Sequence, residues 1–233
     1  MKQKEDSTLK NMNDNKPILA IETSENLCGV SLYFSEKEYY SSTINLKHSH
    51  SEKLFEIIQF LFSTANIGNE EINAIAVSAG PGSFTGLRIG MAAAKGIATG
   101  AGVPIYIVPT FEALAYQLSF ELENGSTFII ANKVNKDEVY YAKFQIKSNN
   151  YIFVEDLTIL TNIKFTKRVN GTKVFGNTPY SSVGELNNSL CSPSPEFIAK
   201  WAMKFGKERM TFDFDYLEPL YIKTFNVKKR QKK

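Results

Sequence analysis

A stretch of small residues from Ser78 to Gly100 constrains this chain more than any other feature, and it reads SAGPGSFTGLRIGMAAAKGIATG. The apolar run at 72–77 before it predicts a short buried strand. The Gly-Pro-Gly sequence at 80–82 can continue neither a strand nor a helix, so we expect the chain to turn there. Ser83 or Gly82 then caps a helix that is predicted to run to about Gly100.

The predicted helix carries glycine or alanine at every fourth position, in a ridge formed by Gly82, Gly86, Gly90, Ala94 and Ala98. Each glycine inside a helix costs roughly 1 kcal/mol relative to alanine, so some interaction should offset that cost. Three explanations fit the spacing, in this order: close packing within the domain, a partner protein's helix lying in the smooth groove, or an anion bound by the N–H groups after the turn.

The first half of the chain predicts one α/β lobe. Three strands at 18–21, 28–34 and 38–44 form a meander. A capping box at 49–52 then opens a helix over 50–66. Phe60 lies on the polar side of that helix and is a candidate contact point. With a further strand at 103–108, the order βββαβαβ is typical of a ribonuclease-H-like lobe with a mixed sheet.

The second half partly repeats this order without repeating the sequence. We expect a helix over 111–122, another over 196–210, and strands at 127–131, 139–146, 151–157 and 174–176. The predicted fold is therefore α/β, with two tandem ribonuclease-H-like lobes in an actin-like architecture. The predicted boundaries are a disordered leader at 1–16, a first lobe at 17–109, a degenerate second lobe with a closing C-terminal helix at 110–222, and a basic tail at 223–233.

Charge and cysteine content exclude several classes of protein. The formal charge of +3 includes five positive charges from residues 228–233, which leaves −2 for residues 1–227. The body is therefore not a basic nucleic-acid surface. The tail is interpreted as a solubilising end in preference to a tRNA-seeking arm. Two isolated cysteines, Cys28 and Cys191, and a polar N-terminus without an apolar run predict a cytoplasmic protein with no membrane segment.

The residues expected of a catalytic centre are missing from their usual places. Actin-like kinases place an aspartate and a glycine turn after the first strand, whereas this chain has Glu22-Thr23-Ser24. The matching turn of the second lobe, at 131–135, has no carboxylate. The only histidines, His48 and His50, are two residues apart in a predicted loop, which does not suit a metal site. We therefore predict neither catalytic nor metal-binding residues.

Four segments resemble the bacterial TsaB (YeaZ) family: ILAIETS at 18–24, SAGPGSFTGLRIG at 78–90, EVY at 138–140 and LEPLY at 217–221. The resemblance spans about residues 17–222. It implies an actin-like fold of the ASKHA class without its own catalytic centre. It also implies a non-catalytic scaffold and dimerisation partner of TsaD. The TsaD complex makes N6-threonylcarbamoyladenosine at position 37 of tRNAs that read codons beginning with A.

The resemblance further implies specific partners and contacts. The partners would be a TsaD-like catalytic subunit, a TsaE-like ATPase, a second copy when the chain is alone, and tRNA through the complex. Helices 50–66 and 83–100 would pair with the partner, with interface residues Phe60, Gly82, Ser83, Phe84, Gly86, Arg88, Gly90 and Ala94. No cofactor is expected in the isolated chain. ATP or ADP is expected at the complex interface, and the candidate nucleotide or anion contacts are Glu22, Thr23, Ser24, Gly80 and Gly82.

Two departures from the family pattern and two other functions stay open. Glu22 stands where the family usually has aspartate, and residues 133–137 replace a segment that often precedes EVY. The first alternative function is an autonomous enzyme, either an actin-like ATP-dependent enzyme or a peptidase-like hydrolase. The second is RNA binding through the tail. Assays of ATP turnover, metal content and tRNA binding on the purified chain would distinguish them.

Overall fold

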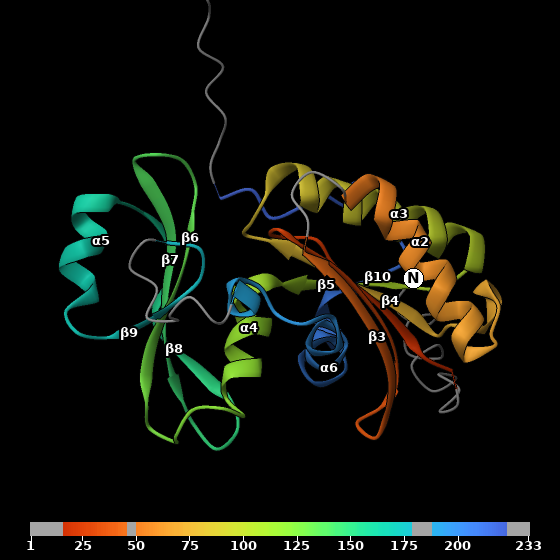
Figure 1. Ribbon diagram of the computed structural model, residues 1–233, viewed down its shortest axis with the longest axis horizontal. Helices are drawn as coiled ribbons and strands as arrows, with labels where there is room; N and C mark the ends of the chain where they lie inside the picture. The colour runs from red at the N-terminus through yellow and green to blue at the C-terminus, as the bar shows by residue number, and fades with distance from the viewer. Residues whose placement is uncertain (1–15, 46–49, 179–187, 223–233) are drawn as a thin grey trace, which may run out of the picture.

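The chain folds into two lobes, each formed around its own β-sheet (Figure 1). The structure is a computed structural model that describes residues 16–45, 50–178 and 188–222. Residues 1–15 of the predicted leader, His48, Ser49 and the basic tail lie outside the described residues. The predicted fold class of two tandem α/β lobes is confirmed by the two sheets and by the order of the elements.

A six-stranded sheet in the order β10-β5-β4-β1-β2-β3 forms the first lobe. Parallel neighbours β1, β4 and β5 occupy its centre. The outer strands run antiparallel to their neighbours. Central strands are buried on both faces, which explains why every residue of β4 is buried. The strands are β1 (Ile18–Glu22), β2 (Leu27–Ser35), β3 (Glu38–Asn45), β4 (Ala74–Gly80), β5 (Ile105–Pro109) and β10 (Met210–Thr211).

Helices cover both faces of this sheet. On one face lie α2 (His50–Ala65) and α3 (Phe84–Ala101), whose buried side chains share a core with Ile21 and Val77. On the other face lies α6 (Pro195–Phe205), which packs with Ala20 and Ala76. Short 3₁₀ turns complete the connections at η1 (Asn69–Glu71), η2 (Asn188–Cys191) and η3 (Gly206–Arg209).

The second lobe is a four-stranded sheet in the order β8-β7-β6-β9. Three antiparallel strands come first, followed by a helix and then by a strand parallel to β6. This order of elements repeats the order at the start of the first lobe. The helix α5 (Asn162–Val169) was not predicted; it has only eight residues, and Phe165 is the only one of them that is buried. The strands are β6 (Thr127–Lys133), β7 (Glu138–Ile146), β8 (Tyr151–Thr161) and β9 (Lys173–Phe175).

The helix α4 (Thr110–Leu118) belongs to both lobes. Ala113 and Tyr116 pack with the first sheet and α6. Leu114 and Leu118 pack with the second sheet. In Figure 1, α4 lies between the two sheets. Burial on both sides accounts for its apolar sequence and makes α4 the apolar joint between the lobes.

The predicted boundary assigned all of residues 110–222 to the second lobe, which is wrong for the C-terminal part. α6 packs on the first sheet, and β10 pairs antiparallel with β5. The physical reason is burial: α4 and α5 already cover the second sheet, whereas the face of the first sheet opposite α2 and α3 needs a cover. Leu217 also joins the core of the first lobe.

Candidate functional site

The Gly-Pro-Gly-Ser sequence forms a tight, internally bonded turn between β4 and α3. The Gly80–Pro81 peptide bond is cis. The Gly80 N–H donates to Thr110 Oγ1 at 3.0 Å. As predicted, Ser83 caps α3, and its Oγ accepts from the Gly86 N–H at 3.2 Å. The turn therefore fixes the direction in which α3 leaves the sheet.

The glycine ridge of α3 faces the chain's own β1–β2 turn. A Cβ at Gly82 would overlap the carbonyl oxygen of Ser24, and one at Gly86 would overlap that of Thr23. A Cβ at Gly90 would overlap Thr23 Oγ1. The ridge is glycine because the helix approaches this turn too closely for any side chain.

This packing corrects the prediction that Gly82, Gly86, Gly90 and Ala94 contact a partner helix. Gly86, Gly90 and Ala94 are buried within the chain, and the Cβ position of Gly82 points at Ser24. Of the three explanations that the spacing left open, close packing within the domain is the one the structure supports. The helix-propensity cost of these glycines is offset by contact with the 23–24 turn.

The same contact buries most of the residues of the predicted nucleotide or anion site. Glu22, Thr23 and Ser24 are fully buried, Gly80 is buried, and Gly82 is half-buried against Ser24. Three backbone N–H groups of this region are already used: Thr23 N–H donates to Ser78 Oγ, Ser24 N–H to Glu22 Oε1 and Ser83 N–H to the Ser24 carbonyl. Glu22, Thr23 and Ser24 are therefore not presented at the surface of the described chain, where a phosphate group could reach them.

Glu22 is a buried acid whose carboxyl group is hydrogen-bonded within the β1–β2 turn. Its Oε1 accepts from both the N–H and the hydroxyl of Ser24. Its Oε2 has no hydrogen-bond partner among the described residues. Burial raises the pKa of Glu22 to about 7, against hydrogen bonds from Ser24 and Ser78 that lower it. A carboxyl group in this state stabilises the turn and is not displayed to a metal or nucleotide.

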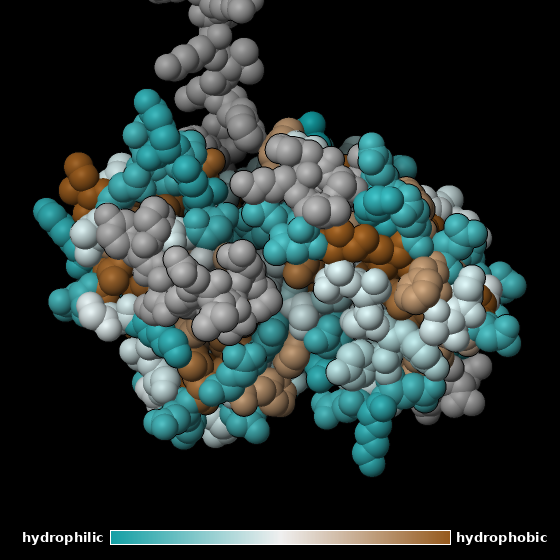
Figure 2. Space-filling model, in the orientation of Figure 1, coloured by the Kyte–Doolittle hydropathy of each residue, from teal (hydrophilic) through white to brown (hydrophobic). Residues whose placement is uncertain are grey.

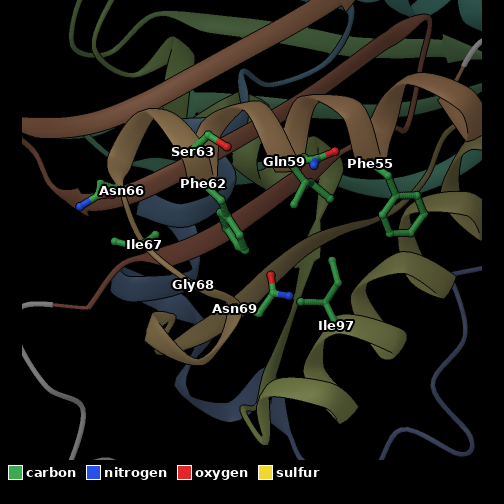
Figure 3. A pocket seen from close by; sticks show the side chains of 10 residues that line it. Phe55, Gln59, Phe62, Ser63, Asn66, Ile67, Gly68, Asn69 and Ile97 are labelled. Carbon is green, nitrogen blue, oxygen red and sulfur yellow. The ribbon is translucent and has the colours of Figure 1, made fainter.

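A different face of the α2–α3 layer is exposed and apolar. Phe55 and Phe60 of α2 are 55% and 61% exposed. Figure 2 shows hydrophobic residues along α2 among hydrophilic ones. A groove between the two helices is lined by Phe55, Ile89, Ala92, Ala93, Gly96 and Ile97. Phe55 and Ile97 point into the space between the helices from opposite sides (Figure 3).

Two glycines on this face have no internal explanation. Gly96 and Gly100 are exposed, and a Cβ at either would meet no atom of the described residues within 4 Å. They lie one turn apart within α3, where each costs roughly 1 kcal/mol relative to alanine. The interface prediction selected Gly86 and Gly90 and missed this pair. The i, i+4 spacing of Gly96 and Gly100 was visible in the sequence, but its exposure was not.

Three of the other predicted interface residues lie around the first turn of α3. Arg88 Nε donates to Tyr221 Oη at 3.0 Å, and its guanidinium carbon lies 3.9 Å from the centroid of the Phe84 ring. The Leu220 N–H donates to the Ala79 carbonyl at 2.7 Å. Phe84 and Arg88 are exposed, while Ser83 is half-buried as the cap. The LEPLY segment at 217–221 is thus hydrogen-bonded to β4 and α3, the two elements that the SAGPGSFTGLRIG segment forms.

A polar cluster between the lobes was missed by the sequence analysis. Glu25, in the β1–β2 turn, accepts hydrogen bonds from Asn132 and Asn177 of the second lobe. Asn132 lies in β6, in the 131–135 segment that the sequence predicted as a turn and that was noted only for its lack of a carboxylate. No local sequence signal links these three residues, because they are brought together by the packing of two separate sheets.

Other reactive side chains give no additional site in the part of the chain that the structure describes. The described residues contain no group of three or more His, Cys, Asp or Glu that could hold a metal ion. Burial raises the pKa of both the Cys28 and Cys191 thiols to about 11, and the charges of Glu22 and Glu25 respectively add to the effect. No described helix combines the length and apolarity that a membrane crossing needs.

Comparison with known families agrees with this picture. Residues 43–169 match the family model described as TsaD, tRNA N6-adenosine threonylcarbamoyltransferase. The chain is 32% identical over 225 residues to the tRNA threonylcarbamoyladenosine biosynthesis protein TsaB of Haemophilus influenzae, covering 90% of this chain and 94% of that protein. It is 27% identical to TsaB of Escherichia coli, covering 88% and 94%.

Solved structures show the same fold. The structure described as YeaZ from Pseudomonas aeruginosa superposes with a TM-score of 0.69 at 22% identity, covering 88% of this chain and 99% of that one. A second structure, described as an uncharacterized protein with similarity to peptidase YEAZ from Pseudomonas aeruginosa, gives a TM-score of 0.69 at 21% identity. The two-lobed actin-like arrangement is therefore shared with these proteins.

Proposed function

Because the chain belongs to the TsaB (YeaZ) family of tRNA threonylcarbamoyladenosine biosynthesis proteins, we propose that it is a non-catalytic subunit that docks a TsaD-like catalytic subunit through α2 and α3. In this role it supports formation of N6-threonylcarbamoyladenosine at position 37 of tRNAs that read codons beginning with A. The chain itself contributes a rigid docking platform and no reacting groups.

The exposed glycine pair on α3 carries this proposal. Gly96 and Gly100 weaken the helix, and no residue that the structure describes lies close enough to require them. A stripe with little side chain lets a second helix approach closely, toward the short end of the usual 8–10 Å interaxial range. Phe55 lines the same groove as this stripe, and Phe55 and Phe60 are large exposed apolar side chains of α2 that a partner would bury.

The match to the TsaD family model supports a TsaD-like occupant of this face. The matched residues, 43–169, include both α2 and α3. A TsaD-like protein should therefore carry helices equivalent to these. Two related helix pairs can then pack face to face about an approximate two-fold axis. We propose that the same face joins two copies of this chain when the catalytic subunit is absent.

The non-catalytic role is supported by the closed turn at the end of β1. The backbone donors at 23–24, 80 and 83 that could hold a phosphate are bonded within the chain, and Glu22 is buried against Ser24. We therefore propose that any ATP or ADP in the complex is held by the partner subunit or at the shared interface. A TsaE-like ATPase and tRNA would reach this chain through the complex, in the cytoplasm.

Co-purification tests the proposal. The chain co-expressed with a TsaD-like subunit should elute with it as one complex, and the chain alone should show no ATP turnover above a buffer control. A chain that hydrolyses ATP or a peptide by itself would contradict the non-catalytic role. A chain that does not associate with the TsaD-like subunit would contradict the docking role.

A further inference from the structure

Glu25 joins the two lobes through its carboxyl group. It lies in the turn between β1 and β2 of the first lobe, close to the end of the chain's first strand. Its Oε1 accepts from Asn132 Nδ2 at 2.8 Å, and its Oε2 accepts from Asn177 Nδ2 at 2.6 Å. Each carboxyl oxygen of one lobe is therefore bonded to a different amide of the other lobe.

Both amides are held in the orientation that this requires. Asn132 Oδ1 accepts from the Asn177 N–H at 3.1 Å, and Asn177 Oδ1 accepts from the Lys133 N–H at 2.6 Å. With each amide oxygen fixed by a backbone donor, each NH₂ group must face the space that the Glu25 carboxyl fills. Asn132 Nδ2 also donates to the Cys191 carbonyl at 3.2 Å. The donors are thus set in place by the second lobe itself.

A glycine allows this arrangement to close. Gly176 has a φ of 120°, a conformation that L side chains rarely adopt. A Cβ there would overlap the Ala131 carbonyl and would lie 2.6 Å from Asn132 Oδ1. Only glycine lets the 176–177 backbone come close enough for the Asn177 N–H to reach Asn132. We define the carboxyl cradle as Asn132, Gly176 and Asn177.

We propose that this carboxyl cradle is a binding site for a carboxyl group and that Glu25 is its built-in ligand, which fastens the first lobe to the second. The two oriented amide donors match the two oxygens of one carboxyl group. The inference stands apart from the docking role on α2 and α3. It also gives a second reason why an external anion is kept out of the cleft, since Glu25 already fills the cradle.

The raised pKa of Glu25 agrees with a carboxyl group that the fold holds away from water. Burial raises the pKa of Glu25 to about 8. The hydrogen bond from Asn177 lowers it, the charge of Glu22 raises it, and the bond from Asn132 lowers it. Removing the carboxyl group should cost both hydrogen bonds, and it should leave the buried Asn132 NH₂ group with only its bond to the Cys191 carbonyl.

Chemical rescue with formate tests the proposal. In Glu25→Ala, the full chain should melt roughly 5 °C below the wild type. Formate is the smallest carboxylate and should enter the emptied cradle, raising the Tm of this variant with a saturable dependence. Sodium chloride at equal ionic strength is the control for a general salt effect. Neither the wild type nor the double variant Glu25→Ala/Asn177→Ala should respond to formate beyond the salt control.

Equal responses of all three proteins to formate would overturn the cradle. A second pair of variants keeps the proposal testable if Glu25→Ala does not fold. Asn177→Asp retains the bond from the Lys133 N–H but places an acid against Glu25, so its Tm should fall. Adding Glu25→Gln should restore part of that loss, because the new amide can donate to Asp. A double variant that melts no higher than Asn177→Asp would likewise contradict the pairing.

Discussion

Gly86 of α3 lies so close to the carbonyl oxygen of Thr23 that the glycine leaves no room for even a methyl group. Alanine at position 86 gains helix propensity of nearly 1 kcal/mol but must displace the backbone of the 23–24 turn. Overpacking of this kind costs about 1–3 kcal/mol. We expect Gly86→Ala to lower the free energy of unfolding, measured by urea denaturation.

The matched control is Gly96→Ala, on the exposed face of the same helix. Nothing lies within 4 Å of its added methyl group, so the variant should be more stable than the wild type by up to about 1 kcal/mol. If Gly86→Ala were as stable as Gly96→Ala, the close contact with Thr23 would not exist in solution.

Glu22 and Glu25 should make the stability of the chain fall as pH rises. Burial raises their pKa values to about 7 and about 8, from an unfolded value near 4.5. A raised pKa means that the folded chain binds protons more tightly than the unfolded chain does. The resulting stabilisation is complete below pH 4.5 and is lost as the pH rises through about 7–8.

Glu22→Gln should flatten this dependence, and the exposed Glu36→Gln should not. The measurement is the Tm at pH values from about 5 to about 9. The groups facing the two acids are Ser24, Ser78 and Cys28 around Glu22 and the two asparagines and Cys191 around Glu25. A Tm that rises across this range would show that the acids are ionised and well solvated in the folded chain.

Both cysteines should react slowly with thiol reagents. Cys28 is 1% exposed and Cys191 is half-buried, and the pKa of each thiol is raised to about 11. Since the thiolate is the reactive form, modification at neutral pH should be much slower than for free cysteine and should accelerate in denaturant. The rate of absorbance change with a chromogenic disulfide reagent measures this. Reaction at the rate of free cysteine would contradict the placement of both thiols.

Tyr221 should stabilise the start of α3 through Arg88 and Phe84. Its hydroxyl accepts from Arg88 Nε, and its ring centroid lies 5.3 Å from that of Phe84. Tyr221→Phe removes the hydrogen bond alone and should cost about 0.5–1.5 kcal/mol of unfolding free energy. Tyr221→Ala also removes the ring contact and should cost more. Equal stability of both variants and the wild type would mean that the 217–222 segment does not hold this position in solution.

The alternation of strands and helices was predictable because it depends on local patterns. The run at 72–77 and the cap at Ser83 specify a strand and a helix whatever the partners are, and both were found in the structure as β4 and α3. The sheet on which α6 packs could not be predicted in this way. The apolar stripe of α6 shows that it packs on a sheet, but not on which of two sheets it packs.

The candidate site was predicted less well than the fold, for a physical reason. A glycine on a helix indicates a close approach, but not whether the approaching atoms belong to the chain or to a partner. Gly86 and Gly96 look alike in the sequence, yet one faces Thr23 and the other faces open space. The Glu25 contacts span 107 and 152 residues, so no spacing rule could have paired Glu25 with Asn132 and Asn177.

The affinity of Gly96→Leu for a TsaD-like subunit tests the central claim most directly. Position 96 is exposed, and a Cβ there meets no described atom within 4 Å, so we expect the variant to unfold at or above the wild-type Tm. The same side chain should obstruct the partner helix and lower the affinity at least tenfold, whereas Thr166→Leu on exposed α5 should bind as the wild type does. Isothermal titration calorimetry of both variants measures this. A stable Gly96→Leu chain that binds the TsaD-like subunit with wild-type affinity would contradict the α2–α3 docking face.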